Sequence, residues 1–359
     1  MPAHLHSPYQ FLILFTIVCM ISNLYQMQSL PIEGDMIPSE LVRSTPTRDT
    51  LDAALRNNEF RLHYQPQLSC SSLQLTGAEA LTRWKQSPSS SKLTNPSHFI
   101  PQAEENGFIM ALGDWCLQTA IQTTSAWERG SLPPHFRTAI NLSVRQITPE
   151  LPKRIDSLIR EAGLDPWRIE LEITESFLFQ DLPTMTDIAR QLRNLGVRVA
   201  IDDFGTGFSV LEHLRHIPAT TIKIDRSFTQ RMLRIERDHI IMRNLIRMIR
   251  DLGMESICEG VETAEQLKAV QDMGADHWQG FLFSPAIPAE NLTLLLPSES
   301  DTPPPPEQPG QITTPETFQN ADRRHSPGPE RAQTWELQLK QNMQKRKLSK
   351  YTNVYAFKI

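Results

Sequence analysis

The sequence is poor in cysteine and holds no apolar run long enough to cross a membrane. The 359 residues include 4 cysteines that lie far apart, with neither a CxxC pair nor a cluster of cysteine and histidine. This usage argues against a disulfide framework and a zinc site, and it indicates reduced thiols in a cytoplasmic protein. A formal net charge of −5 argues against the basic surface with which proteins bind duplex nucleic acid.

The N-terminal segment, residues 1–48, lacks charge at its start. Residues 1–30 contain no Asp, Glu, Lys or Arg, and their apolar run, residues 11–21, is 11 residues long. A spanning helix needs about 20 residues, and the segment lacks the basic start and cleavage site of a signal peptide. Two interpretations stay open: a misassigned start, because Met20, Met27 and Met36 are in frame, or a weak membrane contact through residues 11–21.

The C-terminal segment, residues 298–359, has a composition that does not build a packed core. It contains PPPP at residues 303–306, followed by a basic stretch. From residue 301 on, nine Lys and Arg stand against six Asp and Glu. We expect this tail to be disordered.

The middle of the chain, residues 49–297, repeats strand-like and helix-like patterns. Eight short apolar segments predict strands at residues 61–68, 73–84, 137–143, 169–176, 197–205, 221–227, 255–261 and 277–284. Helical spacing of apolar residues predicts helices over residues 151–162, 185–195, 228–252 and 264–273, and residues 86–130 have room for two more. This alternation indicates an α/β protein, a TIM-like (β/α)8 barrel with an antiparallel first strand. The first strand is antiparallel because the turn at residues 70–72 is too short for a helical crossover.

Polar side chains interrupt or end seven of these strands, in otherwise apolar sequence: Glu79, Asn141, Glu172, Asp202, Asp203, Lys223, Glu259 and Gln279. The carboxyl ends of barrel strands share one face, so the oxygen-bearing members are expected to converge there. Oxygen ligands without His or Cys suit Mg²⁺ or Mn²⁺. A divalent cation also explains the adjacent aspartates, which otherwise repel each other. Asp202 is placed to bridge two such ions.

Taken singly, each of these residues has a structural alternative. The alternatives are a salt bridge between Glu79 and Arg83, a strand-end cap by Asn141, helix-start charges at Glu172 and Glu175, a rim position for Lys223, a structural ion pair of Glu259 and a turn at Gln279. The shared placement at strand ends favours a joint functional role.

Eight segments together resemble one known family. They read YQPQ (64–67), GAEALTRW (77–84), NLS (141–143), EITES (172–176), DDFGTGFS (202–209), IKID (222–225), EGVE (259–262) and QGFLFS (279–284). This ordered set is similar to the motifs of EAL-domain cyclic di-GMP phosphodiesterases, and Glu79 begins the triplet that names the family. The resemblance covers residues 49–297, which we therefore expect to form the phosphodiesterase domain.

The resemblance implies a metal-dependent hydrolase that cleaves one phosphodiester bond of cyclic di-GMP to give linear 5′-pGpG. It implies two ions of Mg²⁺ or Mn²⁺ and a water molecule between them as the nucleophile. Lys223 is expected to polarise that water and Glu259 to act as the general base. The remaining roles implied are metal ligands at Glu79, Asn141, Glu172, Asp202 and Asp203, support of the metal site by Gln279 and Glu262, and substrate binding by Arg83 and Gln65.

The resemblance also assigns roles to the loop after the fifth strand and to a second copy of the chain. Coupling of the metal site to a homodimer interface is expected from Glu175, Phe204, Gly205, Thr206 and Gly207. The sequence departs from the family pattern in GTGFSVLEHL (205–214) and in SPAIP (284–288), where a basic residue and a proline commonly follow the serine. Every expected metal and catalytic position is nevertheless filled, which predicts an active enzyme.

Two other functional classes stay open on the sequence alone. One is a catalytically silent cyclic di-GMP receptor or protein-interaction module. The other is an unrelated Mg²⁺-dependent barrel enzyme, such as an enolase-type lyase, although that class does not explain the order of the motifs.

Overall fold

The computed structural model describes residues 46–86, 93–130, 132–175, 182–205, 214 and 216–296. The predictions for residues 1–45, including the apolar run, and for the tail from residue 297 on lie outside the described residues. The same holds for two residues of the predicted loop, Thr206 and Gly207. Within the described part, no helix combines the length and the apolar character needed to cross a membrane.

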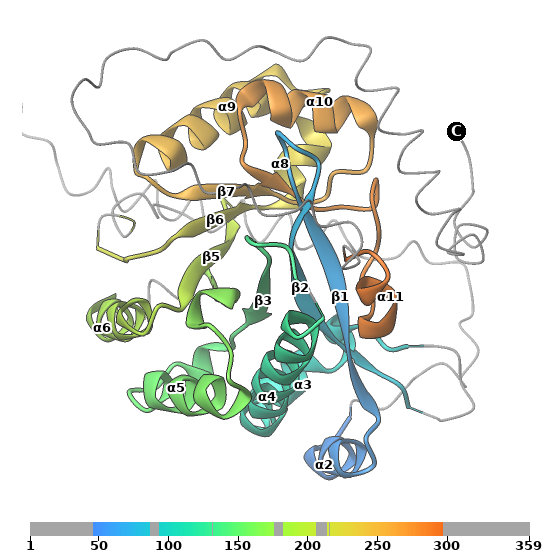
Figure 1. Cartoon of the computed structure of the whole chain (residues 1–359). Helices are drawn as coiled ribbons and strands as arrows, with labels where there is room; N and C mark the ends of the chain where they lie inside the picture. The colour runs from blue at the N-terminus through green and yellow to red at the C-terminus, as the bar shows by residue number, and fades with distance from the viewer. Residues whose placement is uncertain are drawn as a thin grey trace, which may run out of the picture. The chain divides into compact units, whose positions relative to one another are not determined.

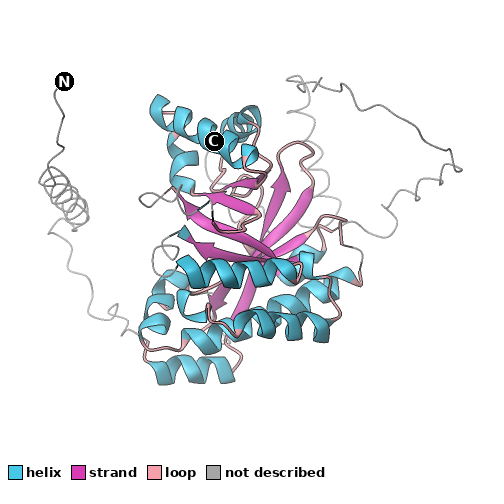
Figure 2. Cartoon of the chain, turned by 90° about the vertical axis from the view of Figure 1, so that its left-hand side faces the viewer, coloured by secondary structure: helices cyan, strands magenta, loops and turns pink. Residues whose placement is uncertain are grey.

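Eight strands close into a barrel (Figures 1 and 2), and a short ninth strand pairs antiparallel with the first. The strands β2 to β8 pair in chain order and run parallel, and β1 pairs antiparallel with both β2 and β8. This confirms the predicted TIM-like barrel with an antiparallel first strand. The bounds are β1 (Phe60–Ser69), β2 (Leu75–Trp84), β3 (Arg137–Asn141), β4 (Ile169–Thr174), β5 (Arg198–Phe204), β6 (Thr221–Ile224), β7 (Glu255–Cys258), β8 (His277–Trp278) and β9 (Ile287–Pro288).

Helices cover the outer surface of the barrel, as Figure 2 shows. Their bounds are α2 (Arg48–Arg56), α3 (Ile100–Glu105), α4 (Ile109–Glu128), α5 (Leu151–Ala162), α6 (Leu182–Asn194), α8 (Arg226–Arg231), α9 (Glu236–Asp251), α10 (Ala264–Met273) and α11 (Ala289–Thr293). Short 3-10 turns lie at Pro96–His98, Val144–Gln146 and Pro166–Arg168. The helices α5 and α10 have the predicted bounds, because each ends at a glycine whose positive φ stops the helix, Gly163 (φ 63°) and Gly274 (φ 80°).

The prediction of a single helix over residues 228–252 is wrong, because the helix is interrupted between α8 and α9. Ile235 is extended, with φ −121° and ψ 105°, and α9 begins directly after it. Acidic residues in the first turn of α9, Glu236 and Asp238, face the positive end of the helix dipole. Arg231 at the end of α8 pairs with Asp238 at 2.8 Å, which holds the two helices together across the break.

The core lies mainly between the barrel and its helices, with a second aromatic cluster beside α2 and α3. Phe60 at the start of β1 stacks on Trp84 at the end of β2, with ring centroids 5.7 Å apart, and packs against Phe99 at 5.6 Å. All three rings are buried. This cluster anchors the two antiparallel strands at the carboxyl end of β2.

Charged side chains form the floor of the barrel at the amino ends of the strands. Glu170 of β4 is fully buried and pairs with Arg137 of β3 at 3.4 Å and with Arg198 of β5 at 2.9 Å. Both arginines also reach Glu255 of β7, each at 2.9 Å. Burial opposes the ionised form of Glu255, but the hydrogen bond from His277 and the two arginines outweigh it and lower its pKa to about 2. The floor therefore joins four strands through alternating charges.

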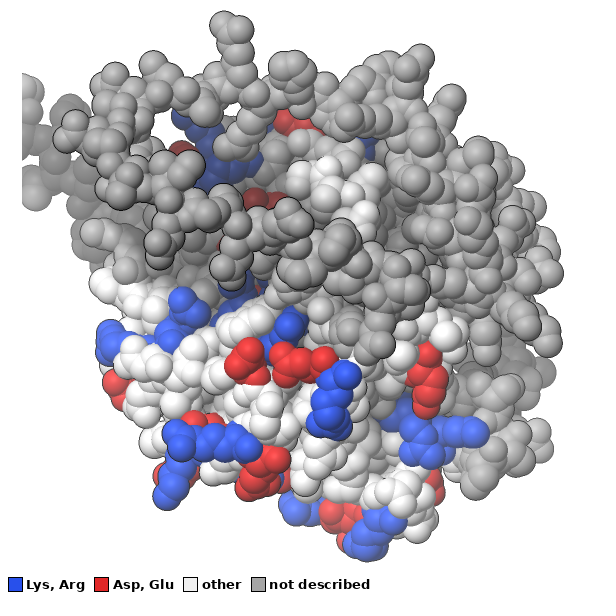
Figure 3. All heavy atoms as spheres, viewed as in Figure 1, with Lys and Arg blue, Asp and Glu red and all other residues white. Residues whose placement is uncertain are grey.

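The outer surface in the view of Figure 3 carries acidic and basic side chains interspersed among neutral residues. No large field of one sign is seen over the described residues on this face. This mixture agrees with the small net charge of −5 for the whole chain.

Candidate active site and metal centre

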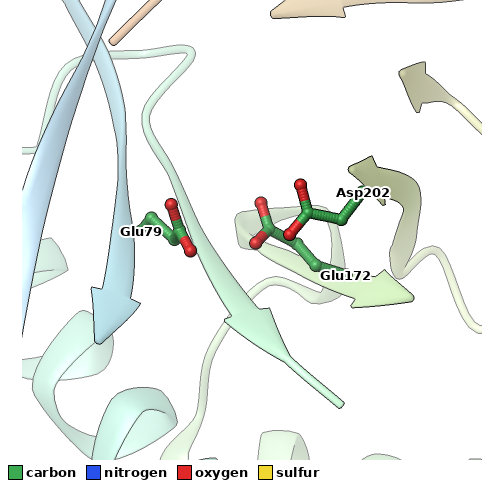
Figure 4. A group of neighbouring side chains, drawn as sticks. All are labelled: Glu79, Glu172 and Asp202. Carbon is green, nitrogen blue, oxygen red and sulfur yellow. The ribbon is translucent and has the colours of Figure 1, made fainter. Parts of the chain in front are cut away.

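The predicted site residues come from successive strands and meet near the carboxyl ends of the barrel. Glu79 lies in β2, Glu172 in β4 and Asp202 in β5, and Figure 4 shows the carboxylates of all three turned toward one another. Glu172 is paired with Asn141 in the strand register, and Asp202 with Thr174. The register thus places side chains from distant parts of the chain at similar heights along the barrel axis.

Lys223 of β6 is the hub of this cluster. Its ammonium Nζ lies 2.9 Å from Glu172 Oε2 and 2.9 Å from Glu259 Oε1. It also lies 3.0 Å from Asp202 Oδ1 and 3.4 Å from Glu79 Oε2. The side chain is fully buried, so the alternative of a lysine at the barrel rim is wrong. One positive charge therefore faces four carboxylates.

Two amide side chains complete the surroundings of Glu79. Asn141 donates from Nδ2 to Glu79 Oε1 at 2.7 Å, and Gln279 donates from Nε2 to Glu79 Oε2 at 2.8 Å. The same Gln279 nitrogen donates to Glu259 Oε1 at 3.0 Å. Glu79 thus takes its described contacts from Lys223 and these amides, whereas the Arg83 guanidinium donates to the Thr82 carbonyl at 2.9 Å.

A β-bulge explains how two adjacent aspartates serve one site. Neighbouring side chains of a regular strand point to opposite faces. The pairing of β5 with β6 shifts register between Ile201 and Phe204, and Asp203 adopts a left-handed conformation with φ 55°. The Asp203 N–H donates to Asp202 Oδ1 at 2.9 Å. As a result, carboxylate oxygens of Asp202, Asp203 and Glu259 all lie within 4.8 Å of one another.

Burial and crowding separate the acidities of these groups. Burial raises the pKa of Glu172 well above its usual value, against the pull of Lys223, and raises that of Glu259 to about 8. Burial and the Asp202 charge raise the pKa of Asp203 to about 6. Burial also acts to raise the pKa of Glu79. The Lys223 charge and the hydrogen bonds from Gln279 and Asn141 outweigh burial, so the pKa of Glu79 is lowered. The four carboxylates keep the pKa of Lys223 well above normal despite its burial.

Comparison with known proteins places this arrangement in one family. The family model described as "EAL domain" matches residues 48–286. The chain belongs to the EAL domain family. It is 41% identical over 245 residues to an uncharacterised signalling protein of Caulobacter vibrioides, covering 68% of this chain and 29% of that protein.

One further EAL relative has an informative name and a solved structure. The chain is 35% identical over 243 residues to the bifunctional diguanylate cyclase/cyclic di-GMP phosphodiesterase MucR of Pseudomonas aeruginosa, covering 67% of this chain and 35% of MucR. A solved structure of the MucR phosphodiesterase in complex with c-di-GMP superimposes with a TM-score of 0.65 at 34% identity, over 68% of this chain and 98% of that one. The chain spans about a third of the length of the curated relatives it matches.

The donor set of this EAL domain fits divalent cations. Oxygens of Glu79, Glu172 and Asp202, all buried, lie within 4.8 Å of one another. Glu172 Oε1 is buried and has no hydrogen-bond partner among the described residues. A buried carboxylate oxygen without a donor is costly unless a cation binds it. The cluster holds four carboxylates and one ammonium group, so its acidic groups outnumber its basic group and favour a bound cation.

The residues predicted to bind substrate lie on β2, the strand of Glu79, and on its neighbour β1. Gln65 of β1 is the register partner of Glu79, and its Nε2 donates to the Ser284 carbonyl at 3.4 Å. Arg83 lies further along β2 and is partly buried, and burial lowers its pKa. Glu262 is exposed and precedes the N-cap of α10, and its N–H donates to Gln266 Oε1 at 2.7 Å. The binding and support roles of these residues stay predictions.

The loop after β5 begins with a well-defined anchor. The Gly205 N–H donates to Glu175 Oε2 at 2.6 Å. Gly205 has φ 98°, and a Cβ there would lie 2.5 Å from the Phe228 ring. Phe204 is buried and pairs with Ile224 of β6. The predicted coupling of this loop to a dimer interface stays a prediction.

One member of the hydrogen-bonded network was missed by the sequence analysis. Gln67 of β1 is 1% exposed, and its Nε2 donates to Gln279 Oε1 at 3.1 Å. It belongs to the segment YQPQ, but a glutamine in a strand carries no local signal that it will meet a residue 212 positions away.

Proposed function

We propose that this EAL domain hydrolyses one phosphodiester bond of cyclic di-GMP to give linear 5′-pGpG, with the help of two Mg²⁺ or Mn²⁺ ions. The observation that carries the proposal is the set of carboxylates at the carboxyl ends of the strands that converges on buried Lys223. The P. aeruginosa relative MucR, which is named as a cyclic di-GMP phosphodiesterase, supports the choice of substrate.

Glu79, Asn141, Glu172 and Asp202 would hold one ion, and Asp202 with Asp203 the other. The Asn141 nitrogen already donates to Glu79, which leaves the amide oxygen for other partners. When bound, two such metal ions stabilise negative charge on the phosphate and lower the pKa of a bound water molecule. Gln279 and Glu262 would support these ligands.

The chain's own residues position water and substrate for the reaction. A water oxygen forms a bond to phosphorus, and the bond from phosphorus to the ribose O3′ breaks. Glu259 takes the proton from the attacking water, and O3′ leaves as a hydroxyl after taking a proton from solvent. Lys223 orients the water through its ammonium. Arg83 and Gln65 hold the nucleotide, because a guanidinium matches a phosphate in a bidentate manner.

The test is hydrolysis of cyclic di-GMP by the full chain in Mn²⁺ or Mg²⁺, with products separated by chromatography. We expect linear 5′-pGpG, and we expect Glu79→Ala, Glu259→Ala and EDTA each to abolish it. The matched control is Glu161→Gln, which changes an exposed carboxylate on α5 outside the site.

Two outcomes would contradict the proposal in different ways. Binding of the nucleotide without any cleavage would make the domain a receptor. If the chain neither binds nor cleaves the nucleotide, cyclic di-GMP is excluded as the substrate. The expected homodimer is a separate proposal, and light scattering of the purified chain decides between one and two copies.

A further inference from the structure

The Gln279 side chain contacts partners at both of its ends. Its nitrogen Nε2 donates to Glu79 Oε2 at 2.8 Å and to Glu259 Oε1 at 3.0 Å. Its oxygen Oε1 accepts from Gln67 Nε2 at 3.1 Å. Gln67 is 1% exposed and Gln279 is 4% exposed. At this depth, a hydrogen bond that is not made within the protein is not replaced by one to bulk water.

The carboxylates determine which way the Gln279 amide must point. The ionised Glu79 carboxylate only accepts hydrogen bonds, so the end of the amide that faces Glu79 must be the nitrogen. The carbonyl oxygen of Gln279 then faces β1 and requires a donor there. Gln67 supplies this donor. A residue with only an acceptor at this position would place two oxygens against each other.

The surroundings of Gln67 argue that it was not selected for packing. Its oxygen Oε1 is buried and has no hydrogen-bond partner among the described residues, which an apolar side chain would avoid. Gly77, its register partner on β2, leaves room for the amide. A Cβ at Gly77 would lie 2.9 Å from Gln67 Oε1 and 2.7 Å from the Arg137 carbonyl oxygen.

We propose that Gln67 is a positioning residue for the metal centre: it fixes the Gln279 amide so that its nitrogen faces Glu79 and Glu259. Gln67 thereby orients two carboxylates of the site without touching metal or substrate. The proposal rests on the proposed function for the identity of the ion, whereas the hydrogen bonds themselves are observed. Mutation of residues that orient metal ligands typically lowers metal affinity by roughly 10–100-fold.

The experiment is a double-mutant cycle on the full chain with Gln67→Met, Gln279→Met and both together. Met keeps a similar volume and removes the hydrogen bonds. Calorimetry gives the Mn²⁺ affinity without reference to activity. In parallel, the side-chain NH₂ signals of Gln279 are followed by ¹⁵N NMR in metal-free protein. Gln102→Met, which changes a half-buried glutamine of α3, is the matched control.

We expect Gln67→Met to weaken Mn²⁺ binding about tenfold, the lower end of the range for such partners. The double variant should bind no more weakly than Gln279→Met, because Gln67 acts through Gln279. The Gln279 NH₂ protons should exchange faster with water in Gln67→Met, while its melting temperature equals that of Gln102→Met.

The proposal is overturned if the losses of the two single variants add in the double variant. It is also overturned if Gln67→Met leaves both the Mn²⁺ affinity and the Gln279 NH₂ signals unchanged. A wild-type chain that binds no Mn²⁺ would instead contradict the proposed function. The NMR signals of the metal-free protein would still decide the role of Gln67 in that case.

Discussion

Replacing Lys223 by methionine tests whether this lysine is the counter-charge of the acidic cluster. Its ammonium lies between 2.9 and 3.4 Å from four carboxylates, and the side chain is fully buried. Lys223→Met keeps most of the buried volume and removes the charge. The carboxylates that stay ionised then repel one another with no cation between them.

The size of the effect follows from the distances. At about 3 Å and an effective dielectric constant of about 20, each pair attracts by about 5 kcal/mol, most of which desolvation offsets. Removing one partner of a buried ion pair typically costs about 3–5 kcal/mol, because it leaves an uncompensated charge. We therefore expect the free energy of unfolding in EDTA to fall by about that amount, or the melting temperature by roughly 10 °C.

Metal ions should restore much of this loss. Mn²⁺ bound to the folded chain stabilises it by mass action, by about 2.7 kcal/mol at 100 times its dissociation constant. In Lys223→Met the ion also takes over as counter-charge, so Mn²⁺ should stabilise the variant more than the wild type. Hydrolysis of cyclic di-GMP should nevertheless remain lost, because the group that orients the water is gone.

Urea unfolding in EDTA and in excess Mn²⁺ measures both effects. Lys268→Met is the matched control, since Lys268 is exposed, pairs with Asp272 on the surface of α10, and should change stability by less than about 1 kcal/mol. The reasoning is refuted if Lys223→Met is no less stable than Lys268→Met in EDTA. It is also refuted if Mn²⁺ leaves the difference between wild type and Lys223→Met unchanged.

Three further predictions concern the barrel floor and the loop after β5. The pKa of Glu255 is about 2 in the folded chain against 4.5 for the free side chain, so its contribution to stability is present above pH 4.5 and is lost as the pH falls toward 2. Glu255→Gln should therefore flatten the fall in melting temperature over this range, and an unchanged profile would count against the floor pairs. Gly205→Ala should destabilise the chain by more than about 1 kcal/mol, measured in urea, because φ is 98° and the new methyl group meets Phe228. Glu175→Gln weakens the acceptor of the Gly205 N–H, so proteolysis should cut the loop faster than in wild type; an equal rate would contradict the anchoring role.

Local pattern was enough for much of the barrel. Apolar runs placed all eight strands, and the short turn before β2 required an antiparallel first strand. Glycines that stop helices gave α5 and α10 their ends. Because the carboxyl ends of barrel strands share one face, the polar residues that end them could be grouped without knowing any contact.

Other features depend on which strands become neighbours and could be read only from the folded chain. The sequence allowed Lys223 a place at the barrel rim, but the closed barrel buries it among four carboxylates. The bulge that turns Asp203 toward Glu259 depends on the pairing of β5 with β6. Gln67 reaches Gln279, 212 residues later, only because β1 closes the barrel against β8. The sequence by itself determined which groups are available to the site, and the tertiary structure decided their partners, because hydrogen bonds and ion pairs act over a few ångströms while local pattern spans only adjacent turns and strands.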